Sequence, residues 1–97
     1  MADTCGTLCL AAETLLSHGA SAVHAIVVHP ILSGQAVERV EGSPLTSLVV
    51  FNTTPLTQAA QECKKIQSIN VASVFAEAIK RCHMGQSMSF LFKHATI

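Results

Sequence analysis

Three short runs rich in apolar residues constrain the fold of this chain more than any other feature. They cover residues 22–28, 47–51 and 66–69, and the first reads Ala-Val-His-Ala-Ile-Val-Val. A nearly unbroken apolar run is typical of a strand buried on both faces, as in a parallel sheet. Pro30 ends the first run, and the polar loop Asn-Thr-Thr-Pro follows the second. We therefore predict three strands, the first two buried on both faces.

Between these runs, apolar residues recur at helical spacing. Residues 8–16 form one such pattern, and Gly19 follows it where a glycine commonly ends a helix. Ser33 is suited to cap a short helix over residues 34–40. Three residues of that helix would point inward: Ala36, Val37 and Val40. A weaker pattern in residues 56–65 indicates a helical turn.

The last third of the chain carries the clearest helical pattern. Asn70 would cap a helix that Gly85 ends, and its apolar stripe between residues 71 and 82 is interpreted as core. Residues 87–92 alternate enough to predict an edge strand. This order predicts an α/β fold with a mostly parallel sheet and flanking helices. No strand precedes the first helix, so we expect the sheet to lack its first strand.

The composition favours a domain that makes further contacts. The 97 residues are 49% hydrophobic and only 12% charged, with six basic and six acidic side chains. The net charge of zero gives no electrostatic case for binding nucleic acid or an anionic membrane. The excess of apolar residues indicates a surface that meets the rest of a longer chain, a partner subunit, or both.

The sequence also bears on location. No run of eighteen apolar residues could form a transmembrane helix. Asp3 stands where a signal peptide would carry positive charge, so we expect a cytoplasmic protein. The cysteines form neither a C-x-x-C pair nor a disulfide framework: Cys5, Cys9, Cys63 and Cys82.

The first residues predict a phosphate-binding turn. Asp3, Thr4, Cys5, Gly6 and Thr7 run directly into the first helical pattern. A helix start has unpaired N–H groups and the positive end of the helix dipole, threonine hydroxyls can donate, and glycine allows close approach. The carboxylate of Asp3 would repel a phosphate, so it would face a sugar hydroxyl or cap the amides of the loop. An ordinary helix cap with a glycine turn is the alternative on spacing alone.

Other reactive side chains show no catalytic pattern. Cys5 is interpreted as a small filler rather than a nucleophile, because no base has a recognisable relation to it. The five histidines lack metal-binding spacing and are interpreted as surface or hydrogen-bonded residues: His18, His24, His29, His83 and His94. His29 is the exception, because it lies at the end of a predicted strand, on the side where ligands bind in such sheets. We expect no metal ligands and no catalytic residues in this chain.

Four segments in sequence resemble the phosphoribosyl pyrophosphate synthetases. They are MADTCGT, HPILSGQA, VVFNTTP and NVASVFAEAIKRCHMGQSMSFLF, and they follow in order between residues 1 and 92. Pro30 stands where this family usually has glycine, and residues 94–97 match the family's tail only loosely. The resemblance implies a type I phosphoribosyltransferase fold over residues 1–97, as the C-terminal part of a longer enzyme.

The same resemblance implies an activity and a site. The family makes phosphoribosyl pyrophosphate and AMP from ATP and ribose 5-phosphate. It implies that Thr4, Gly6 and Thr7 hold the 5-phosphate, that Cys5 contributes its N–H, and that Asp3 serves the loop or the sugar. The ATP-binding segments and the ligands of Mg²⁺ would lie outside this chain, so we expect it to be inactive alone.

The resemblance also implies assembly and regulation. In the family, serines of the tail help to form a regulatory phosphate or ADP site at a subunit interface, and Ser87, Ser89 and Phe92 occupy those positions. A homo-oligomer or an assembly with synthetase subunits is therefore expected. Two alternatives stay open: a non-catalytic subunit associated with synthetases, and a phosphoribosyltransferase that consumes their product.

Overall fold

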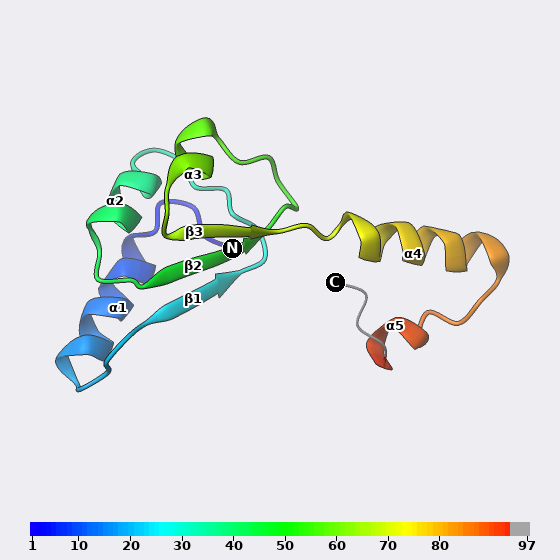
Figure 1. Cartoon of the computed structure of the whole chain (residues 1–97), viewed down its shortest axis with the longest axis horizontal. Coiled ribbons are helices and arrows are strands. Elements are labelled where there is room, and N and C mark those ends of the chain that lie inside the picture. The colour runs from blue at the N-terminus through cyan, green and yellow to red at the C-terminus, as the bar shows by residue number, and fades with distance from the viewer. Residues whose placement is uncertain (94–97) are drawn as a thin grey trace.

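A computed structural model describes residues 1–93, which contain a parallel three-stranded sheet and its helices (Figure 1). The elements follow in the order α1 (Gly6–Ser17), β1 (His24–Val27), α2 (Ala36–Gly42), β2 (Ser47–Phe51), α3 (Gln58–Glu62), β3 (Ile66–Ile69), α4 (Ala72–Met84) and α5 (Phe90–Lys93). The strands lie in the order β1-β2-β3, and both pairs are parallel. The predicted α/β fold with a parallel sheet is confirmed. Residues 94–97 lie outside the described part, and with them the loosely matching tail and His94.

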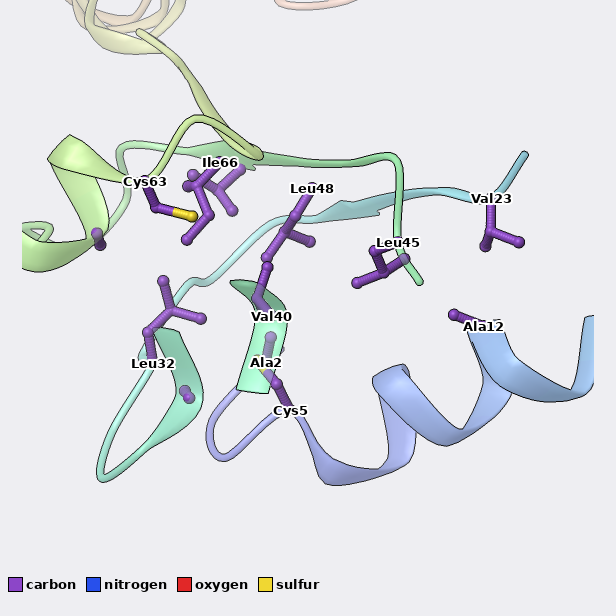
Figure 2. Close-up of a cluster of buried hydrophobic side chains, with 13 residues drawn as sticks. Ala2, Cys5, Ala12, Val23, Leu32, Val40, Leu45, Leu48, Cys63 and Ile66 are labelled. Carbon is purple, nitrogen blue, oxygen red and sulfur yellow. The ribbon is translucent and has the colours of Figure 1, made fainter. Parts of the chain in front are cut away.

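One face of the sheet carries the core. Leu48 of the central strand β2 is fully buried and points toward Val40 of α2, while Leu45 lies above Ala12 of α1 (Figure 2). Val50 continues the same buried face of β2. Because side chains alternate along a strand, the residues between these point to the other face.

That other face is largely open, so the prediction of strands buried on both faces is wrong for this chain. In β1, Ile26 is 71% exposed, and Val28 just beyond the strand is 51% exposed. Ile26 pairs with Val49 of β2, which is only partly buried. Ala12 of α1 and Val40 of α2 lie on the side of the sheet to which Leu45 and Leu48 point (Figure 2).

The first two helices form close to their predicted positions. Gly19 follows α1 with φ of 102°, the left-handed region that favours glycine at a helix end. The second helix begins at Ala36 rather than at residue 34, with Gln35 as its N-cap. The carbonyl of Ser33 accepts from Ala36 N–H, but its hydroxyl donates to Asp3 instead of capping the helix. The inward positions are confirmed, since Ala36 and Val40 are fully buried and Val37 packs against the core.

The helices α3 and α4 form where the sequence predicts them, but the apolar stripe of α4 is not part of the core. Thr57 caps α3 through its side chain, and the Asn70 carboxamide accepts from Ala72 N–H at 2.8 Å at the start of α4. Gly85 ends α4 in the left-handed conformation, as predicted. No residue of α4 is buried, and its Ile79 is 70% exposed. Figure 1 shows the reason: α4 leads away from the sheet, and of the described elements only the short α5 lies beside it.

The predicted edge strand over residues 87–92 is wrong, because this segment turns back along α4 and ends in α5. Arg81 holds it there. Its Nη1 donates to the carbonyl of Ser87 at 3.0 Å, and its guanidinium lies 4.0 Å from the centre of the Phe90 ring. An edge strand would pair with a neighbouring strand, whereas these contacts hold the segment against α4. Within residues 1–93, no helix is long and apolar enough to span a membrane.

Candidate functional site

The first residues of the chain are fixed beside the carboxyl end of β1. Ala2 N–H donates to the carbonyl of His29 at 3.1 Å, and the carbonyl of Ala2 accepts from Leu32 N–H at 3.0 Å. Ala2 and Pro30 thus form a single parallel bridge on the side of β1 away from β2. Neither hydrogen bond needs an N–H from Pro30, so proline is tolerated at this position. Ligands of open α/β sheets bind at this end of the strands.

Cys5 turns the chain from this bridge into α1. It has φ of 64° and ψ of 13°, a left-handed conformation that is uncommon for a residue with a side chain. Its side chain is 5% exposed and lies in the core near Val40 (Figure 2). Burial raises the pKa of the Cys5 thiol, and the nearby Cys9 raises it further. A neutral, buried thiol is a filler rather than a nucleophile.

The start of α1 offers unpaired donors to solvent. In the described part of the chain, no acceptor faces the N–H groups of Gly6, Thr7 or Leu8. The hydroxyls of Thr4 and Thr7 also lack a hydrogen-bond partner within residues 1–93, and both residues are exposed. These groups surround an open hollow of about 190 Å³, lined by residues 1–8 and Val27. Free N–H groups at the positive end of a 12-residue helix suit an anion.

Two further contacts hold the loop from outside the hollow. The carboxylate of Asp3 accepts from the hydroxyl of Ser33. The Nη1 of Arg39 donates to the carbonyl of Thr4 at 3.0 Å. The carboxylate of Asp3 is therefore tied to the segment before α2 rather than to the amides of its own loop.

The structure thus gathers the five predicted loop residues around one hollow. Arg39 and Val27 were missed by the sequence reasoning. The signal for Arg39 was its place between the inward positions Ala36, Val37 and Val40 of a short helix, but it could be interpreted only with α1 in place. Among the described residues, no three His, Cys, Asp or Glu side chains lie close enough to hold a metal ion.

His29 lies at the end of β1, where its Nδ1 is 2.8 Å from the hydroxyl of Thr53. That hydroxyl donates to the carbonyl of Val28, also at 2.8 Å, so it accepts from Nδ1–H of His29. His24 is exposed and bonds in a similar way to Ser47. Both histidines therefore fit the interpretation as hydrogen-bonded surface residues.

The residues expected to form a regulatory site lie at the far end of α4 from the sheet (Figure 1). The hydroxyls of Ser87 and Ser89 are 2.7 Å apart, and both residues are exposed. Phe92 belongs to α5. The chain therefore brings the two serines together, and their regulatory role stays a prediction.

Comparison with known proteins agrees with this geometry. A sequence model of the family described as the phosphoribosyl synthetase-associated domain matches residues 1–93. The chain belongs to this family. A crystal structure of phosphoribosylpyrophosphate synthetase from Mycobacterium smegmatis is similar, with a TM-score of 0.81 and 26% sequence identity.

The similarity extends over only part of the mycobacterial synthetase. The match covers 86% of this chain but 28% of the mycobacterial chain. The chain thus spans less than a third of the length of the synthetase it matches. The family and the structural similarity to a phosphoribosylpyrophosphate synthetase are therefore shown, whereas the activity and the role of the loop are proposals.

Proposed function

We propose that this chain supplies the ribose 5-phosphate loop of a ribose-phosphate diphosphokinase. The observation that supports this most is the set of unpaired N–H groups of Gly6, Thr7 and Leu8 around the hollow at the start of α1. A phosphate would accept from these groups and from the hydroxyls of Thr4 and Thr7. Cys5 would contribute its N–H alone, because its side chain is in the core.

In this proposal the loop positions the sugar and performs no bond chemistry. The 1-hydroxyl of ribose 5-phosphate would attack the β-phosphorus of ATP, the bond from the β-phosphorus to the α–β bridging oxygen would break to release AMP, and the hydroxyl proton would pass to solvent. Mg²⁺ would neutralise charge on the nucleotide. Magnesium and ATP would be held outside the described residues, which contain no metal-ligand cluster. Fixing the 5-phosphate orients the reacting hydroxyl, which lowers the entropic part of the barrier. The chain alone is therefore proposed to bind ribose 5-phosphate and to be inactive.

Calorimetric titration with ribose 5-phosphate tests this proposal. The wild-type chain is expected to bind ribose 5-phosphate and not ribose. Thr7→Val, which removes a hydroxyl from the loop at nearly constant volume, is expected to weaken binding about tenfold, as for the loss of one hydrogen bond to a charged group. Thr14→Val is the matched control, because Thr14 lies on the same helix and its hydroxyl donates to Leu10. Equal affinities of the two variants would contradict the proposed loop, and so would AMP release from ATP by the chain alone.

A non-catalytic subunit that assembles with synthetases is the second candidate. The uncovered apolar side of α4 favours it, since Phe75 is 56% and Ile79 70% exposed. Exposed apolar side chains grouped on one helix often mark a contact with another protein. Co-purification with a full-length synthetase that is abolished by Ile79→Glu, together with a change in synthetase activity, would support this candidate. Ribose 5-phosphate binding without such assembly would favour the first.

A further inference from the structure

A cation from a neighbouring helix holds the candidate phosphate loop. Arg39 lies on α2, where Ala36 and Val40 face the core. Its Nη1 donates to the carbonyl of Thr4 at 3.0 Å. Within the described chain, the hollow is lined by residues 1–8 and Val27, so Arg39 acts on the loop from beside the hollow. The carbonyl of Arg39 is in turn 3.6 Å from the thiol of Cys9 on α1, which links the same two helices.

The contact with Thr4 sets the direction of the next N–H group. In a trans peptide the C=O and N–H bonds point in opposite directions, and no peptide bond of the described chain is cis. Holding the Thr4 carbonyl toward Arg39 therefore holds Cys5 N–H on the opposite side of the peptide. Cys5 is left-handed and Gly6 begins the helix. Consecutive residues in such a pair of conformations turn their N–H groups toward one point, which makes a concave anion site.

Arg39 also brings a permanent positive charge to the loop. Burial raises the pKa of the Cys5 thiol, whereas Arg39 acts in the opposite direction, so its charge is felt at the loop. This charge offsets the carboxylate of Asp3, which would otherwise disfavour an anion in the hollow.

We propose that Arg39 is a positioning residue for the 5-phosphate: it fixes the Thr4–Cys5 peptide so that the loop N–H groups face the ligand. The inference rests on the proposed function, since it deepens the account of the same site. It assigns a role in phosphate binding to a side chain that does not line the hollow.

The experiment uses the whole 97-residue chain and three variants. Arg39→Met removes the charge and the donors, and Arg39→Lys keeps a single charged donor. Lys65→Met is the matched control, because Lys65 donates to the carbonyls of Glu41 at 3.1 Å and Ser43 at 2.7 Å, at the other end of α2. Two quantities are measured: the amide NMR resonances of Cys5, Gly6 and Thr7 without ligand, and the affinities for ribose 5-phosphate and inorganic phosphate.

We expect Arg39→Met to shift the three loop resonances and to weaken the binding of both ligands about tenfold, as for the loss of a charge-assisted hydrogen bond. Arg39→Lys should recover part of the affinity. Lys65→Met should lower the melting temperature and leave the loop resonances and affinities unchanged. Wild-type loop resonances and affinities in Arg39→Met would overturn the inference. If the wild type binds neither ligand while Arg39→Met still shifts the loop resonances, the proposed function fails and the positioning of the peptide stands.

Discussion

The one-sided core makes a quantitative prediction for two residues on neighbouring strands. Leu48 is fully buried at the centre of β2, whereas Ile26 of β1 is 71% exposed on the opposite face. Leu→Ala in a core costs about 2–5 kcal/mol, from lost transfer free energy and the cavity left behind. We take about 3 kcal/mol for Leu48→Ala, since a small domain with one open face can partly close a cavity. Ile26→Ala loses less than a third of a buried side chain, which is below about 1 kcal/mol.

These free energies give a large difference in melting temperature. In a domain of this size 1 kcal/mol corresponds to about 4–8 °C, so Leu48→Ala should melt about 12–24 °C lower than the wild type. Ile26→Ala should melt within about 8 °C of it. Urea unfolding followed by circular dichroism measures both free energies of unfolding. A loss above about 2 kcal/mol in Ile26→Ala would show that its face of the sheet is covered and would refute the one-sided core.

Four further predictions test particular residues. Gly6→Ala should unfold at the same or a slightly higher temperature, because the new Cβ would have only ordinary contacts. Any loss of ribose 5-phosphate affinity in this variant would then come from contact between the new methyl group and the ligand, not from a destabilised loop. The pKa of Cys5 is raised above its ordinary value of 9.0, so its contribution to stability should be complete below pH 9 and fall as the pH rises further, and Cys5→Ala should flatten this part of the profile. Alkylation should reach the exposed Cys82 before Cys5, and equal rates would contradict the burial of the Cys5 side chain. Asn52 accepts from the first N–H before α4 and donates to Asn70, so Asn52→Ala should lower stability by about 1–3 kcal/mol and speed amide exchange there, whereas unchanged exchange would contradict this link.

Much of the fold could be predicted from the sequence because its signals are local. The apolar runs gave β2 and β3 at their observed bounds, and Gly85 ended α4 as expected. Such signals depend on the preferences of a few neighbouring residues, which tertiary contacts do not override here. The start of α2 was misjudged because Ser33 finds a partner in Asp3, thirty residues away in sequence.

The wrong predictions concern which surfaces of the chain pack against each other. An apolar pattern shows that a surface avoids water but not what covers it, so the stripe on α4 and the second face of β1 were taken as buried within this chain. The edge strand failed for a related reason, since Arg81 reaches both Ser87 and Phe90 and draws the segment onto α4. The hydrogen bond from the Arg81 side chain to a backbone carbonyl six residues further along leaves no periodic pattern in the sequence.

The candidate site, too, could be predicted only in part. The loop from Asp3 to Thr7 could be located from its residue types and its place before a helix. Its conformation could not, since the left-handed Cys5 is held by burial of its side chain and by the contact between Arg39 and Thr4. Both depend on α2, which is distant in sequence and adjacent in space.

Titration of the isotope-labelled chain with ribose 5-phosphate, followed by amide NMR, tests the central claim most directly. The account predicts saturable shifts centred on Cys5, Gly6, Thr7 and Leu8, smaller shifts with inorganic phosphate at the same amides, and none with ribose. Saturable shifts confined to another part of the chain, or no shift at millimolar ribose 5-phosphate, would contradict the claim that the start of α1 is a phosphate site.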